Sequence, residues 1–463
     1  MLDDMFDYLE HIRERPVWQP IPREVRDTFR RTLPAGPTPV DELHAIFMQR
    51  ILPYTVGNVH PGFMGWVHGG GTPVGMLAEM LAGGLNANLG GRDHAPIEVE
   101  RQILLWMREM FRFPETASGL FVTGTSMANM IGLLVARNAA LGTASRRTGI
   151  AASGKRLTAY ASSATHECIA QAMDMSGIGS DALRVIPVSE NHQIDLDALQ
   201  RRIAEDRASG CTPFLLVGSA GTVDIGAIDD LSGLAAIARS QHLWFHVDGA
   251  FGAIAMLSPV LARRLDGIEL ADSIAFDFHK WGQVPYDAGY ILVRDGELHR
   301  ACFSSAAAYL RRETRGLAAG SPWPCDFGPD LSRGFRALKT WFTLSAYGSG
   351  ALGRSIERTC ELAQYLKHRV EQDSRLELLA PVALNIVCFR YRCSDADAVN
   401  ARIVIDLQES GVAAPSTTII GGRLAIRAAI VNHRTGEGDI DRLVDSVIRF
   451  GESESVSAQV LPS

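Results

Sequence analysis

The middle of the chain alternates between short apolar runs and longer segments with helical periodicity. The apolar runs are GLFVTG (119–124), LTAYAS (157–162), FLLVGS (214–219), LWFHVD (243–248), DSIAFD (272–277) and YILV (290–293). Strands that are continuously apolar are typical of a sheet covered on both faces, with helices connecting its strands. We therefore predict that residues 69–340 form a large α/β domain around a mostly parallel central sheet.

The pattern differs on either side of this domain. Residues 1–68 contain a charged helical opening, a proline-punctuated stretch and a helix near 40–52, with too few apolar positions for a core of their own. We predict that they form an N-terminal helical arm that packs on a partner subunit. Residues 341–463 combine a charged helix with the runs ALNIVCFRYR and RLAIRAAIVN and a further helix near 438–450. This combination predicts a small α+β C-terminal domain.

Composition and charge exclude several classes of protein. The 463 residues are 46% hydrophobic and 21% charged, which is typical of a globular chain and not of a disordered or fibrous one. The net charge of −7 gives no basic excess that would neutralise nucleic acid phosphates. No apolar run is long enough for a membrane helix, and the charged N-terminus is unlike a secretory signal. The seven dispersed cysteines form no CxxC pair, so we expect reduced thiols in a cytoplasmic enzyme.

Two predicted strands end in residues that can do chemistry. In DSIAFDFHKW, Lys280 follows an apolar run between Phe278 and Trp281, and such a lysine can form a Schiff base with a carbonyl. Asp248 ends the run LWFHVD, and a pyridinium nitrogen would be a suitable partner for this carboxylate. Taken alone, a surface lysine after a buried strand is the commoner arrangement, and Asp248 could instead cap the following helix.

Two further features lie where a strand gives way to a helix. The segment VTGTSMANM (122–130) predicts a strand, a short turn and a helix, whose first N–H groups and the hydroxyls of Thr125 and Ser126 would seat a phosphate. His166, in SSATHECIAQA, follows a strand and opens the next helix. Each signal is weak alone, because Ser and Thr are ordinary helix caps and a lone histidine is more often structural.

Taken in order, the phosphate seat, His166, Asp248 and Lys280 resemble the pyridoxal-phosphate-dependent amino-acid decarboxylases of the glutamate and aromatic L-amino acid decarboxylase group. The resemblance covers nearly the whole chain and includes NVHPGFMGW, GTSMAN, THE, HVDGA, FHKW, AAYLRRE, LSRGFRALKTW and NHRT. It implies fold type I, similar to aspartate aminotransferase, and a homodimer with shared active sites. It also implies pyridoxal 5'-phosphate as cofactor, no metal, and conversion of an L-amino acid to its amine through a Lys280 Schiff base and a quinonoid intermediate.

The resemblance implies a role for each matching residue. Lys280 would carry the cofactor, Asp248 would keep its pyridine nitrogen protonated, and His166 would stack on the ring face near the substrate carboxylate. Tyr309, in the loop AAYLRRE, would return a proton to Cα. Further cofactor contacts would come from Gly124, Thr125, Ser126, Ser219, Thr222, Ala250 and His279, and from the backbone of Leu331 and Ser332 across the dimer.

The sequence leaves alternatives to this reaction open. Some members of the group carry Phe at the position of Tyr309, and there the outcome shifts toward oxidative formation of an aldehyde; Tyr309 argues against that variant. Transamination or another lyase reaction on the same scaffold is a further alternative. A non-catalytic relative is disfavoured because Lys280, Asp248 and His166 are all present.

The substrate is also open, because the expected pocket departs from the aromatic decarboxylases. Substrate contacts are expected from Trp66, Val67, His68, Arg92 and His94. Asn58 stands where an aromatic residue would align. Arg92 could fork onto an acidic substrate, or it could form a structural ion pair with Asp93 or Glu98.

Overall fold

The computed structural model describes residues 1–304 and 312–460, the last six of these as helical backbone only. The chain forms two compact units. The smaller unit combines Met1–Pro73 with Arg358–Ser463, and the larger unit is Val74–Glu357. Helix α13 (Arg336–Gln372), which is kinked at Gly348, contains the residue at which the two units divide. The predicted arm and the predicted C-terminal domain therefore share one unit, and packing of the arm on a partner subunit stays a prediction.

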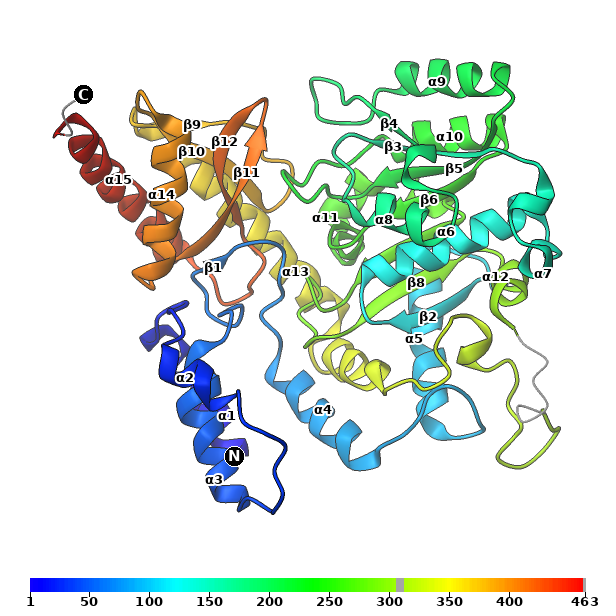
Figure 1. Cartoon of the computed structure of the whole chain (residues 1–463), viewed down its shortest axis with the longest axis horizontal. Coiled ribbons are helices and arrows are strands. Elements are labelled where there is room, and N and C mark those ends of the chain that lie inside the picture. Colours follow the sequence, from blue (N-terminus) through cyan, green and yellow to red (C-terminus); the bar gives the residue numbers. More distant parts are fainter. Residues whose placement is uncertain (305–311, 461–463) are drawn as a thin grey trace. The chain divides into compact units, whose positions relative to one another are not determined.

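The larger unit is built on a seven-stranded sheet with strand order β2-β8-β7-β6-β5-β3-β4 (Figure 1). The strands are β2 (Ser118–Val122), β3 (Leu157–Ser162), β4 (Leu183–Ile186), β5 (Thr212–Ser219), β6 (Trp244–Asp248), β7 (Ser273–Asp277) and β8 (Gly289–Val293). Six of them run in the same direction, and β8 is antiparallel to both of its neighbours. The predicted α/β class with a mostly parallel central sheet is confirmed.

The larger unit also contains several helices. They are α4 (Pro73–Leu85), α5 (Ala95–Phe111), α6 (Thr125–Leu141), α7 (Ser145–Thr148), α8 (Cys168–Met175), α9 (Leu196–Ala208), α10 (Leu231–Gln241), α11 (Pro259–Ala262) and α12 (Gly296–Phe303). Helix α6 packs across β5, β6, β7 and β8, and many of its side chains are buried. This explains why α6 reads as apolar on most sides rather than as an amphipathic surface helix.

The smaller unit has its own sheet, with strand order β1-β11-β12-β10-β9. The strands are β1 (Phe63–Met64), β9 (Leu376–Leu378), β10 (Ile386–Tyr391), β11 (Ala414–Ile420) and β12 (Arg423–Ala429), and the helices are α1 (Leu2–Glu10), α2 (Arg23–Thr28), α3 (Val40–Ile46), α14 (Ala396–Glu409) and α15 (Glu437–Val460). Strand β1 pairs in parallel with β11, so the N-terminal segment adds a strand to a C-terminal sheet. Across the described part of the chain, no helix combines the length and the apolar character that crossing a membrane requires.

Candidate active site

Several strands of the larger unit end at one edge of its sheet, and predicted site residues lie at those ends. Ser219 and Asp248 are the last residues of β5 and β6 and are register partners. Lys280 follows β7, Gly124 follows β2, and His166 follows β3. Because these five strands run in the same direction, their carboxyl ends share an edge, which is where ligands bind in α/β sheets.

Asp248 is a buried carboxylate with two short contacts. Its Oδ2 accepts a hydrogen bond from Asn129 Nδ2 at 3.0 Å, and its Oδ1 accepts one from the backbone N–H of Ala250 at 3.1 Å. Burial raises the pKa of Asp248, while the nearby charges of Lys280 and His166 oppose this rise. A buried carboxylate of this kind is stabilised by a cationic partner.

Lys280 is held at the same edge by an acid that the sequence did not single out. Its Nζ lies 2.9 Å from Oδ2 of Asp277, the last residue of β7, and the Asp277 carboxylate is almost fully buried. The flanking Phe278 and Trp281 are buried as well, whereas the Lys280 side chain is 24% exposed. The lysine is therefore anchored yet reachable, as a residue that bonds to a small molecule must be.

The turn after β2 has the features of an anion seat. Gly124 is the N-cap of α6, and the Thr125 hydroxyl is buried without a hydrogen-bond partner among the described residues. A Cβ atom at Gly289 would lie 2.4 Å from Gly124 Cα, so glycine at position 289 allows the turn to approach β8 closely. A buried unpaired hydroxyl at a helix N-terminus suits an oxyanion, because the first N–H groups of the helix also lack partners.

His279 lies beside this turn. A Cβ atom at Gly124 would lie 3.7 Å from His279 Cε1. The Nδ1 atom of His279 accepts a hydrogen bond from the N–H of Ala288 at 2.9 Å, and its Nε2 lies 3.6 Å from Asp277 Oδ2. Burial lowers the pKa of His279 to about 4. The ring is therefore neutral near pH 7, with its proton on Nε2 available to an acceptor.

Three more predicted cofactor residues lie at neighbouring strand ends. The His166 side chain is exposed, and its Nδ1 accepts a hydrogen bond from the first N–H of α8 at 3.1 Å. The Ser219 N–H donates to Oδ2 of the buried Asp229 at 2.8 Å, and Thr222 Oγ1 accepts from the Ala227 N–H at 3.0 Å. These bonds fix the turn after β5; contact of the three residues with a cofactor stays a prediction.

The loop carrying Leu331 and Ser332 is exposed but firmly anchored. The next residue, Arg333, is 3% exposed and forms a two-pronged ion pair with Glu100, with contacts of 3.0 and 2.6 Å. A buried pair with good geometry holds its segment in place, since breaking it would leave an uncompensated charge. The loop is thus held in a fixed form, and its predicted role toward a partner's cofactor stays a prediction.

Arg92 forms neither of the two structural ion pairs that its neighbours in the sequence suggested. Its guanidinium lies 4.7 Å from the centroid of the Trp323 ring, as in cation–π pairs. Within the described ranges, no ion pair joins Arg92 to Asp93 or Glu98, and Glu98 pairs with Arg101 of α5. His94 is the N-cap of α5, and its Nε2 is buried without a hydrogen-bond partner among the residues that the structure describes.

The remaining predicted site residues lie in the smaller unit or outside the described residues. Trp66 is 54% exposed and stacks on His68 with ring centroids 5.8 Å apart, whereas Val67 is buried. Asn58 donates a hydrogen bond to a nearby carbonyl in the same unit. Substrate contacts from these residues stay predictions, and Tyr309 lies outside the residues that the structure describes.

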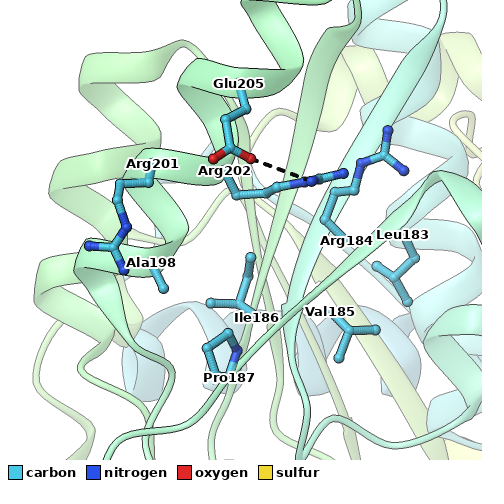
Figure 2. Close-up of a pocket in the computed structure, with 9 residues that line it drawn as sticks. All are labelled: Leu183, Arg184, Val185, Ile186, Pro187, Ala198, Arg201, Arg202 and Glu205. Carbon is cyan, nitrogen blue, oxygen red and sulfur yellow. Dashed lines mark hydrogen bonds and ion pairs between the residues drawn. The ribbon is translucent and has the colours of Figure 1, made fainter.

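A pocket of about 470 Å³ lies between β4 and α9, and none of the predicted site residues lines it. Figure 2 shows the side chains that line this pocket. Arg202 pairs with Glu205 at 3.4 Å, and Arg184 pairs with Asp206 at 3.0 Å. These cationic side chains are therefore largely balanced by neighbouring carboxylates. The pocket lies along the edge strand of the sheet and adds nothing to the candidate site.

Three buried polar residues that connect to Asp248 through successive hydrogen bonds were not predicted from the sequence: Asn129, His246 and Ser273. All three lie inside segments that were singled out for other residues. The available signal was a polar side chain within an otherwise apolar run, which requires a partner when it is buried. The identity of that partner depends on contacts between distant segments and cannot be predicted from either run.

The sequence matches the pyridoxal-dependent decarboxylase conserved domain over residues 22–392. The chain belongs to this family. It is 31% identical to an aromatic-L-amino-acid decarboxylase of Bacillus atrophaeus over 98% of this chain and 95% of that protein. It is 28% identical to a phenylacetaldehyde synthase of Arabidopsis thaliana over 93% and 90%. The crystal structure of Oryza sativa TDC with PLP and tryptamine is similar with a TM-score of 0.89, 25% identity and coverage of 98% and 96%.

The predicted family, fold type and cofactor are confirmed: the chain is a fold-type I, pyridoxal-phosphate-dependent carboxy-lyase. The residues at the sheet edge fit the cofactor of this family. The unpaired Thr125 hydroxyl at the start of α6 suits its phosphate, and the buried Asp248 carboxylate suits its ring nitrogen. The reachable Nζ of Lys280 suits its carbonyl carbon.

Proposed function

We propose that this decarboxylase converts an L-amino acid, with aromatic amino acids as the first class, to the corresponding amine. The observation that carries the proposal is that Asp248 ends strand β6 and Lys280 follows its parallel neighbour β7, at one edge of the sheet. The aromatic class is supported by the relative from Bacillus atrophaeus, which is named for aromatic amino acids.

The proposed roles follow from the chemistry of each side chain. Bound pyridoxal phosphate supplies an electron sink for the electron pair that remains on Cα when CO2 leaves. Lys280 binds the cofactor's carbonyl carbon through Nζ. Asp248 holds a proton on the ring nitrogen, because a buried carboxylate stabilises the positive charge there. Thr125 and the neutral His279 donate hydrogen bonds to the phosphate.

The remaining roles concern the substrate. His166 would lie over the cofactor's ring and near the substrate carboxylate. Tyr309 donates the proton that replaces CO2 at Cα. The chain acts as a homodimer, in which Leu331 and Ser332 complete the partner's phosphate site.

The first test is CO2 release from a panel of L-amino acids, with every product identified by mass. We expect tryptophan, tyrosine, phenylalanine or dihydroxyphenylalanine to give the amine and CO2 in equal amounts, and glutamate and aspartate to give neither. Strong turnover of an acidic amino acid would contradict the substrate class. No CO2 from any amino acid, with yellow and folded protein, would contradict decarboxylation itself.

A second candidate, oxidative formation of an aldehyde, is favoured by the relative from Arabidopsis thaliana, which is named an aldehyde synthase. In that reaction the amino acid, O2 and water give the aldehyde, CO2, ammonia and hydrogen peroxide. Tyr309 disfavours it, because rapid protonation of Cα removes the carbanion before O2 reacts. Oxygen uptake by the unaltered enzyme during turnover would support this candidate.

We expect Tyr309→Phe to lower amine formation by about 10²-fold, the lower end of the usual effect of a general acid. Aldehyde, peroxide and oxygen uptake should rise in the same variant, because the unprotonated carbanion is left to react. An oxygen electrode and mass analysis measure both products. Tyr347→Phe, at an exposed position of α13, is the matched control. Unchanged amine output from Tyr309→Phe would remove Tyr309 as the proton donor.

A further inference from the structure

Strand β6 presents three polar or aromatic residues on the same face of the large sheet. Trp244, His246 and Asp248 alternate along the strand, and alternate residues of a strand point to one side. Neighbours on that face are about 6.6 Å apart along the strand, too far for a direct hydrogen bond. Ser273 of β7, the register partner of His246, bridges the first gap, and Asn129 of α6 bridges the second.

The chemistry of these groups fixes which atom donates in each contact. An ionised Asp248 only accepts, so Asn129 directs its Nδ2–H at Oδ2 (3.0 Å) and its Oδ1 at His246 Nε2 (2.8 Å). The ring proton is therefore on Nε2, and Nδ1 accepts from the Ser273 hydroxyl at 2.7 Å. Ser273 Oγ accepts in turn from Trp244 Nε1–H at 2.8 Å, because an indole only donates. All four hydrogen bonds point toward Asp248.

The chain of hydrogen bonds is buried, and helix α6 leaves space for it. Asn129, His246 and Ser273 are each at most 1% exposed. Burial lowers the pKa of His246 to about 3, which keeps the ring neutral with a single proton. A Cβ atom at Gly132 of α6 would lie 2.8 Å from His246 Cε1. A glycine inside a helix is unfavourable by itself, and here its missing side chain leaves space for the imidazole.

We infer that Trp244, Ser273 and His246 form a positioning relay that keeps Asp248 ionised and aimed at the cofactor's ring nitrogen through Asn129. Aligned hydrogen bonds polarise one another, so each distant donor strengthens the final bond to the carboxylate. Without them, desolvation would favour the neutral acid, which stabilises a pyridinium poorly. This inference rests on the proposed role of Asp248, and none of the relay residues needs to touch the substrate.

The test compares two cofactors in the full-length protein after its own cofactor has been removed. Pyridoxal phosphate has the ring nitrogen that Asp248 would hold, and its 1-deaza analogue has carbon there. The unaltered protein should bind pyridoxal phosphate more tightly than the analogue. Ser273→Ala should lower this preference about fivefold, and His246→Leu at least about tenfold, the usual effects of losing neutral and charge-linked hydrogen bonds. His246→Gln, whose amide can still donate to Asn129, should recover part of the loss.

The matched control is an equally buried pair that does not reach Asp248. His299 Nδ1 lies 2.8 Å from Ser118 Oγ, and both side chains are buried in the same unit. His299→Leu should lower the melting temperature but leave the preference between the two cofactors unchanged. A reduced preference in the relay variants alone supports the inference. Unchanged preference in Ser273→Ala, which removes one oxygen, and in His246→Leu would overturn it.

The failure of the proposed function would give a different result. If the unaltered protein bound both cofactors equally, Asp248 would not be the partner of the ring nitrogen, and the relay would be overturned together with that assignment. If the unaltered protein prefers pyridoxal phosphate and the relay variants show a preference of the same size, only the relay is overturned. The absorbance of the bound cofactor in the visible range reports binding in every case, independently of turnover.

Discussion

Replacing Lys280 with alanine is expected to lower CO2 release by about 10⁴-fold or more and to remove the visible absorbance of the bound cofactor. Lys280 Nζ is the amine at the carboxyl edge of the sheet that is both anchored, by Asp277, and partly exposed. Absorbance spectra and CO2 release measure the two losses. Treatment of the unaltered enzyme with borohydride, followed by digestion and mass analysis, should locate the cofactor on the Lys280 peptide.

Two controls separate this chemistry from the folding of the site. Lys280→Arg preserves a cation opposite the buried Asp277 carboxylate but offers no amine, so it should fold and still lose both signals. Lys339→Ala removes a lysine that is 3% exposed and pairs with Glu79 in the same unit, and it should retain the cofactor absorbance. Persistence of the absorbance in Lys280→Ala would disprove the assignment.

The second large effect is expected at Asp248. Asp248→Ala should lower decarboxylation about 10³-fold, because the buried carboxylate would no longer stabilise positive charge on the ring nitrogen. The same variant loaded with N-methylated pyridoxal phosphate should regain much of the activity, since this compound carries the positive charge permanently. The smaller alanine side chain also leaves space for the methyl group. CO2 release with each cofactor measures the rescue.

The control for Asp248 is another buried acid of the larger unit. Asp206 is 4% exposed and pairs with Arg184 beside the edge strand. Asp206→Asn should lower stability without making the enzyme respond better to the methylated cofactor. Equal losses with both cofactors in Asp248→Ala would mean that Asp248 supports the fold and does not hold the ring nitrogen.

The sequence predicted most of the large sheet because its strands are buried on both faces. The run LTAYAS coincides with β3, and LWFHVD exceeds β6 by one residue. Lys280 and Asp248 could be singled out because residues at or shortly after the end of such a run lie at the edge of the sheet. Strand β4 was not predicted, since it lies at the side of the sheet and exposes Val185 next to Arg184, so its pattern is not apolar.

Contacts between distant segments could not be predicted in the same way. Asn129 meets Asp248 across 119 residues only because α6 crosses β6 and β7. Arg92 shows the same limit at short range. An ion pair with one of the nearby acids was one of two alternatives, but the Arg92 guanidinium lies over Trp323, more than 200 residues further along the chain. Such pairs depend on how elements pack, and local pattern contains little information about packing.

The pairing of β1 with β11 has a consequence for biosynthesis. Val74–Glu357 is continuous in sequence, so all its contacts are available once Glu357 has left the ribosome. Met64, by contrast, pairs with Pro415, about 350 residues later. At the usual rate of 5–20 residues per second, β1 waits about 20–70 s for its neighbour to be synthesised. The smaller unit is thus completed after the larger one during translation, although its strand β1 is synthesised before every strand of the larger unit.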